Sequence, residues 1–219
     1  MKNLVLAAVI IETCAFAWKP SLRFVRPSAD SAIATTHSAL DQLGERPLNL
    51  PVVQSGEPCP VSKGSQPTVP RVDYIFCSSC YWFGKGPVYL ALAWHDGLSD
   101  NAVFSINRVP YEEHAYRAKT PWVSVPDYSG PILIRGRRLD DKHGSKLRFR
   151  FSGSKPNERL KLDASPPRKD PTHWSFWPSS MYVPGPGCYG MQIGTAQGTD
   201  VVIFSTMAPA RTPAVSSRR

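Results

Sequence analysis

The stretch KLRFRF at 146–151 alternates strictly between basic and apolar side chains, and this period of two constrains the fold more than any other feature of the chain. Leu147, Phe149 and Phe151 share one face, and the basic residues share the other. A half-buried β-strand has this period. The stretch VYLALAW at 88–94 has the same character, so both stretches are predicted to be strands.

Further strand-like stretches are separated by turn signals such as HDG, DYSG, DDKHG, PGPG and AQG. These stretches are 72–76, 102–106, 122–125, 132–139, 188–193 and 201–205. The 22 prolines and 15 glycines favour turns over long helices. Eight short strands with no amphipathic helix between them predict an all-β fold, an antiparallel β-sandwich.

The sandwich domain is predicted to cover residues 51–208. Within it, 152–179 is expected to be a long, strand-poor loop. Residues 18–50 are predicted to be a loosely ordered arm with one short helix near 38–43. The tail at 209–219, rich in Pro, Ser and Arg, is predicted to be disordered.

The first 17 residues have the pattern of a signal peptide. Lys2 is followed by an apolar run at 4–11, which is too short to span a bilayer, and by Ala15-Phe16-Ala17. Cleavage is expected after Ala17, with a buried N-terminal strand as the alternative. A lipid anchor at Cys14 is less well supported, because small residues do not precede it. No later run is long enough for a transmembrane helix, so the predicted location is secreted or periplasmic.

Removal of the leader would leave four cysteines, Cys59, Cys77, Cys80 and Cys188. An even number in an exported chain favours disulfides. Four cysteines allow three connectivities, and Cys59–Cys188 with Cys77–Cys80 is the favoured one.

The segment at 178–194, PSSMYVPGPGCYGMQIG, is typical of a strand, a tight turn and a second strand. It resembles the corner of immunoglobulin-like sandwiches in which a tyrosine near the start of a strand binds the upstream backbone. Cys188 and Tyr189 are adjacent and must face opposite sides of a strand. Tyr189, Met191 and Ile193 are predicted to face the core, so a bond from Cys188 would hold a segment against the outside of the sheet.

The chain also resembles a loose group of uncharacterised exported bacterial proteins with an early Cys-Pro and a late Pro-Gly-Cys-aromatic motif. The matching residues are Cys59-Pro60 and Pro186-Gly187-Cys188-Tyr189. This resemblance implies export and brings no activity with it.

The pair Cys77 and Cys80 has two alternatives to a structural disulfide. A redox dithiol sits at the start of a helix that lowers the thiol pKa, whereas the sequence YWFGKGPVYL that follows contains two glycines and a proline and is strand-like. A zinc site would need two more ligands from Cys59, Cys188 or the histidines, and their spacing does not favour one.

Basic residues cluster on two predicted neighbouring strands. They are Arg135, Arg137 and Arg138 before the DDKHG turn, and Lys146, Arg148 and Arg150 after it. If the two strands form a hairpin, these side chains share one surface, which is either a solvated sheet face or an anion-binding site. In an exported protein with a net charge of +9, anionic envelope polymers are expected as partners rather than nucleic acid.

The sequence WSFWPSS supplies a third candidate surface. Trp174 and Phe176 would share a face in an extended segment, and Trp177 would oppose them. Such rings stack on sugars at recognition surfaces, or they close the open end of the sandwich.

Catalytic signatures are weak. The chain has no G-x-S-x-G elbow, and YEEHAY lacks the second histidine of a zinc-protease helix. The main prediction is therefore an exported, non-catalytic β-sandwich with an immunoglobulin-like topology. It is expected to be a structural or binding module of the cell envelope, without cofactor or metal, that binds anionic polymers or polysaccharide. The alternatives are a secreted hydrolase using Glu112 or His114, and a thiol–disulfide redox protein using Cys77 and Cys80.

Overall fold

The computed structural model describes residues 39–54, 56–65, 81–92, 100–106, 109–163 and 174–207. Strands dominate these ranges, and the predicted all-β sandwich is confirmed. The strands are β1 (Tyr81–Phe83), β2 (Val88–Leu92), β3 (Val103–Ser105), β4 (Tyr111–Glu112), β5 (Ala115–Lys119), β6 (Trp122–Ser124), β7 (Ile132–Arg138), β8 (Arg148–Phe151), β9 (Arg159–Leu162), β10 (Ser175–Trp177), β11 (Ser179–Val183), β12 (Gly187–Thr195) and β13 (Gly198–Met207).

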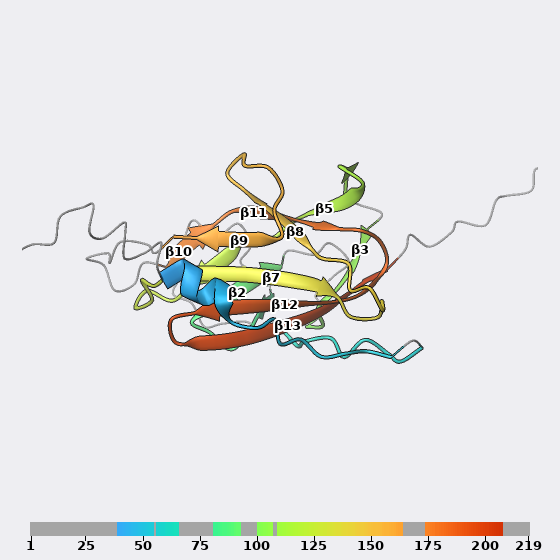
Figure 1. Ribbon diagram of the computed structural model, residues 1–219, viewed down its shortest axis with the longest axis horizontal. Coiled ribbons are helices and arrows are strands. Elements are labelled where there is room, and N and C mark those ends of the chain that lie inside the picture. Colours follow the sequence, from blue (N-terminus) through green and yellow to red (C-terminus); the bar gives the residue numbers. More distant parts are fainter. Residues whose placement is uncertain are drawn as a thin grey trace, which may run out of the picture.

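The strands form three hydrogen-bonded sheets, with orders β1-β2-β6-β10, β4-β5-β11-β8 and β3-β13-β12-β7-β9. The two four-stranded sheets continue into one another, because only Thr120 and Pro121 separate β5 from β6 and only Pro178 separates β10 from β11. At this break the Thr120 amide donates to the Ser179 carbonyl, at 2.9 Å. The two sheets thus make one bent layer opposite the five-stranded sheet (Figure 1).

The main core lies between these layers and takes apolar side chains from all three sheets. Tyr189, Met191 and Ile193 of β12 are buried in it, as the alternation predicts. Leu147 and Phe149 from the KLRFRF stretch are buried there as well. The period of two therefore identified the inward face of both stretches.

The turn before β12 has the hydrogen bond that the immunoglobulin-like corner implies. The Tyr189 hydroxyl donates to the carbonyl of Gly185, four residues upstream, at 2.8 Å. The Thr206 hydroxyl donates to the same carbonyl at 2.8 Å. This local corner fixes where β12 begins, whereas an immunoglobulin-like topology for the whole sandwich stays a prediction.

The outer face of the five-stranded sheet is covered by the chain that precedes β1. A helix at 39–45 lies over this sheet (Figure 1). Its Leu40 and Leu43 pack against Leu133 of β7. Residues 46–65, called the strap below, then cross β12 and β13. Residues 39–50 are therefore packed against the sheet and do not form the loosely ordered arm predicted for this stretch.

The strap is held by polar contacts along β12. The Asn49 amide donates to Gln192 Oε1 at 2.7 Å, and Gln192 Nε2 donates to the Pro47 carbonyl at 3.0 Å. Further along, Leu50 packs beside Gly190, which offers no side chain that would hold the strap away. Small residues on the outer face of β12 thus allow a second backbone to lie close to the sheet.

The predicted strand-poor loop at 152–179 is partly wrong, because it contains β9 and β10. β9 extends the five-stranded sheet by pairing with β7. Its alternation between exposed and buried residues is regular but only four residues long. Residues 164–173, in the middle of the predicted loop, lie outside the described residues.

Several predictions fall on other parts of the chain that the structure does not describe. They are the leader at 1–17, the arm at 18–38, the strand at 72–76 and the tail at 209–219. Within the described ranges, no helix has the length and hydropathy that a bilayer crossing needs.

Candidate functional site

Three arginines surround one tyrosine on the outer face of the β4-β5-β11-β8 sheet. Tyr182 of β11 pairs directly with Arg117 of β5 on one side and with Arg148 of β8 on the other. Side chains in directly opposed positions lie on the same face. Met181 and Val183 point into the core, so Tyr182 points outward. We call this surface the arginine–tyrosine face.

Tyr182 is only 1% exposed although it lies on the outer face. The guanidinium carbons of Arg148 and Arg150 each lie 5.5 Å from the centre of its ring. These are cation–π distances, so the two arginines cover the tyrosine. Burial raises the pKa of the Tyr182 hydroxyl, with Arg150 opposing the shift and the hydrogen bond to Glu112 adding to it.

The carboxylate of Glu112, from the edge strand β4, joins several donors of this face. Its Oε1 lies 2.7 Å from Arg117 Nε and 3.6 Å from Arg150 Nη2. The Tyr182 hydroxyl donates to the same oxygen at 3.2 Å. One carboxylate oxygen therefore meets three donor groups from three different strands.

Glu113 makes the second set of contacts. Its carbonyl oxygen accepts from Arg148 Nη2 at 2.6 Å, and its carboxylate lies 3.7 Å from Arg148 Nη1. Lys119 adds a fourth cation to the face, since it stands opposite Ser180 as Arg150 does on the other side. Four cations and two carboxylates leave this surface with a positive balance.

The two glutamates lie at the end of β4 and in the turn that joins β4 to β5. Glu113 and His114 form this two-residue turn with φ values of 51° and 60°. A two-residue hairpin turn with positive φ at both positions is normally made by Asn-Gly or a similar pair. Residues with a Cβ adopt it at a cost of about 1 kcal/mol each.

The predicted basic hairpin is wrong as a single surface, because β7 and β8 belong to different sheets. Only the start of the hairpin forms, where the Leu147 amide donates to the Gly136 carbonyl at 3.0 Å. The chain then crosses to the other layer. Arg148 and Arg150 therefore lie on the arginine–tyrosine face without the arginines of β7.

The β7 arginines have separate local roles. Arg135 donates to the Arg46 carbonyl at 2.7 Å and so supports the strap. Arg138 pairs with Asp140 at 2.6 Å. Arg137 lies beside Gly144, and its Nε is buried without a hydrogen-bond partner among the described residues. Lys146 pairs with Glu158 at 2.6 Å.

The predicted aromatic surface lies on the outer face of the β1-β2-β6-β10 sheet. Trp174 contacts Trp82 edge-on, with ring centres 5.1 Å apart, and Tyr89 with centres 6.5 Å apart. Phe176 belongs to the same cluster. Trp177 points into the main core, so the opposed orientation predicted for it is confirmed.

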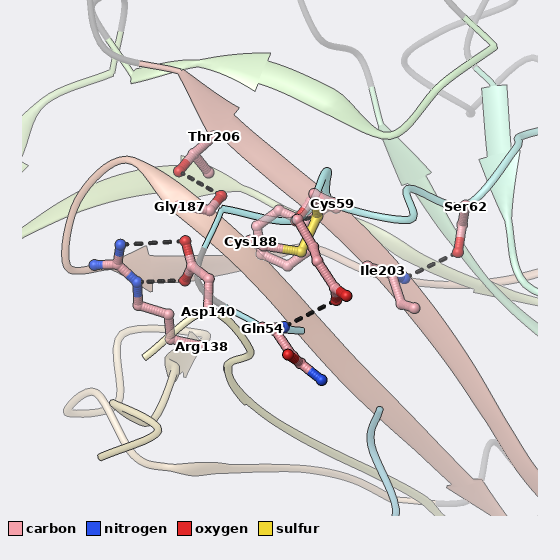
Figure 2. The surroundings of a disulfide bond; sticks show 11 residues. Gln54, Cys59, Ser62, Arg138, Asp140, Gly187, Cys188, Ile203 and Thr206 are labelled. Carbon is pink, nitrogen blue, oxygen red and sulfur yellow. Dashed lines mark hydrogen bonds and ion pairs between the residues drawn. A yellow bond between two sulfur atoms is a disulfide. The ribbon is translucent and has the colours of Figure 1, made fainter. Parts of the chain in front are cut away.

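The structure contains the Cys59–Cys188 disulfide, the pairing that the sequence favours. Cys188 lies outside the main core, in a small cluster with Leu50, Val53 and Leu139. Figure 2 shows the bond joining the strap to β12, with Ser62 bound to Ile203 of β13 beside it. The bond therefore fixes the strap against the outer face of the sheet.

The other predicted chemistries can be placed only in part. Cys77 and Cys80 lie outside the described residues. Cys59 and Cys188 are bonded to each other and supply no thiolate for zinc. No group of three metal-ligating side chains occurs in the portion that the structure describes. Glu112 is engaged by Arg117, Arg150 and Tyr182, which does not favour its use as a general base.

Arg117 and Tyr182 were not identified from the sequence as site residues. Their outward positions were readable from the alternation in AYRAK and SSMYV, but their proximity depends on the pairing of β5 with β11. These strands lie more than 60 residues apart, and no local pattern specifies that pairing.

Comparisons with known proteins include a distant likeness to a solved structure. No family model and no curated protein match the chain. A crystal structure described as that of a putative lipoprotein from Bacillus anthracis is similar at 13% identity and a TM-score of 0.39. The match covers 68% of this chain and 88% of that chain.

Proposed function

We propose that the protein is an exported, non-catalytic binding module of the cell envelope that binds an anionic polymer through the arginine–tyrosine face. The observation that carries this proposal is the convergence of Arg117, Arg148 and Arg150 on one sheet face. Guanidinium groups in this arrangement suit bidentate binding of anions. Each of the three is about a third exposed or slightly less, so a ligand can reach them.

Export is supported by the disulfide and by the signal-like leader. Disulfides persist in oxidising compartments and are rare where thiols are kept reduced. The Cys59–Cys188 bond joins residues 129 positions apart and holds the strap on β12. A secreted or periplasmic location follows as part of the proposal.

Retention on an immobilised anionic polysaccharide such as heparin tests the binding surface. The double variant R148S/R150S should weaken binding about tenfold or more, since one hydrogen bond to a charged group contributes about 1.5–3 kcal/mol. The salt concentration at elution should fall with it. The control R159S/K161S makes the same change in charge on β9, in the other layer, and should elute nearly as the unmodified protein does.

Equal losses in the two double variants would show that only net charge matters, and would overturn the assignment to this face. Circular dichroism and thermal unfolding establish whether R148S/R150S still folds. The double variant R148K/R150K retains the charge and loses the forked geometry of arginine. Its retention on heparin should therefore lie between that of R148S/R150S and that of the control R159S/K161S.

A second candidate is carbohydrate binding at the aromatic cluster of Trp82, Tyr89, Trp174 and Phe176. Three of these rings are half-exposed, which suits stacking on sugar rings. Replacing Trp174 with alanine should then weaken retention on a neutral polysaccharide while leaving heparin retention unchanged.

A further inference from the structure

We propose that Glu112 occupies the position of a ligand carboxylate, and that the natural ligand is a carboxylate-bearing polymer such as a uronic-acid polysaccharide. Binding would displace β4 and the β4–β5 turn from β5, β8 and β11, which keep the three donor groups in place. This inference rests on the proposed function, and it adds the class of anion and the way in which access is controlled.

The first argument is the set of donors around Glu112. Arg117, Arg150 and Tyr182 direct an Nε–H, an Nη–H and a hydroxyl toward one carboxylate oxygen, over 2.7, 3.6 and 3.2 Å. The donors belong to β5, β8 and β11, whereas the acceptor belongs to β4. The receptor part therefore remains assembled when β4 moves away.

The second argument is the weak attachment of β4. It is a two-residue strand at the edge of its sheet and pairs only with β5 in that sheet. Tyr111, half of that strand, is 60% exposed. The turn that follows holds Glu113 and His114 in the left-handed region, which stores strain. A two-residue edge strand followed by a strained turn costs little to displace.

The third argument concerns the chemistry of the site. Glu113 places a second carboxylate 3.7 Å from Arg148, next to the position of Glu112. Two adjacent carboxylates over a row of cations resemble a polymer with a carboxylate on each unit. The planar guanidinium groups match such carboxylates in pairs of parallel hydrogen bonds.

The experiment compares binding of polygalacturonate and of inorganic polyphosphate by isothermal titration calorimetry. Replacing Glu112 with glutamine frees the donors, so polygalacturonate should bind about tenfold more tightly than it binds the unmodified protein. The control E158Q removes one negative charge from the pair with Lys146, away from the face. It should change binding by about twofold or less, as expected of an exposed pair.

A second variant tests displacement without changing the charge of Glu112. His114→Gly relieves strain at φ 60° and stabilises the closed hairpin. Binding of polygalacturonate should therefore weaken by about threefold to fivefold. Polyphosphate should bind more weakly than polygalacturonate to every variant that retains the three arginines.

The possible outcomes distinguish this inference from the function on which it rests. If the unmodified protein binds both polymers through Arg148 and Arg150, and E112Q matches E158Q, the carboxylate-mimic inference is wrong and the anion-binding function stands. A preference for polyphosphate would also overturn the inference. If neither the unmodified protein nor E112Q binds either polymer, both proposals fail.

Discussion

Two tyrosines, Tyr182 and Tyr189, are almost fully buried, one on the outer face of a sheet and the other in the core between the layers. Tyr189 lies in the core, stacked on Phe204 with ring centres 5.3 Å apart, and its hydroxyl is bound by the corner before β12. Tyr182 lies on an outer face and is covered by arginine side chains. The same type of side chain is thus buried at Tyr189 by apolar packing and at Tyr182 by charged groups.

Tyr189→Phe should lower the free energy of unfolding by about 1 kcal/mol near neutral pH, because a buried hydrogen bond is lost. Burial raises the pKa of the Tyr189 hydroxyl above its ordinary value of 10.0, with Arg138 opposing the shift. The folded protein then holds this proton more tightly than the unfolded chain does. Its contribution is fully present below pH 10 and is lost as the pH rises through the folded-state pKa.

Urea unfolding between pH 7 and 11 measures both effects. The phenylalanine variant should lose less stability above pH 10 than the unmodified protein. Thr206→Val is the matched control, since it removes the other donor to Gly185 and no titratable group. This variant should be destabilised at pH 7, and its free energy of unfolding should decline above pH 10 as steeply as that of the unmodified protein. Identical alkaline declines in all three proteins would contradict the assignment to Tyr189.

At the scale of the elements, a strand's inward face was predictable and its neighbours were not. The period of two in β8 and β12 identified which residues enter the core, because alternation along a strand fixes the face on which each side chain lies. Pairing depends on where the chain crosses between layers. The expected β7–β8 hairpin ends after one bridge, between Arg137 and Lys146, where Leu147 turns toward the core. Arg148 and Arg150 were therefore predicted as site residues with the wrong companions.

Gly136 is the residue that allows this crossing. A Cβ at this position would lie 2.7 Å from the Gly190 carbonyl oxygen and 2.7 Å from Leu147 Cδ1. Gly136→Ala should therefore cost about 2–3 kcal/mol, because a backbone atom of β12 cannot move aside. Gly194→Ala is the control on the adjacent strand, since its Cβ would meet atoms only at 3.5 Å or more.

Thermal and denaturant unfolding of the two glycine variants provide the measurement. Gly194→Ala should be neutral or slightly stabilising, because glycine within a strand costs about 0.5–1 kcal/mol relative to alanine. Comparable stabilities of the two variants would show that the close approach at Gly136 is relieved without cost.

At the scale of the whole molecule, the disulfide closes a loop that contains most of the sandwich. The double variant C59S/C188S should lose about 4–5 kcal/mol of stability, as expected from loop-closure entropy for a separation of 129 residues. Ser62→Ala removes one strap hydrogen bond, which Ile203 N donates at 2.9 Å, and should cost only about 1 kcal/mol. Guanidinium unfolding compares the two variants, and equal losses would mean that the covalent bond adds nothing to the strap's other contacts.

The position of this bond also determines the path of mechanical load through the protein. Tension between the two ends of the chain would pass from the strap through the Cys59–Cys188 bond directly into β12 and β13. Strands β1 to β11 lie between the two cysteines in the sequence and are bypassed. A chain pulled in this way would extend only its ends and its last two strands, while the arginine–tyrosine face, which is built from β4, β5, β8 and β11, would carry no load.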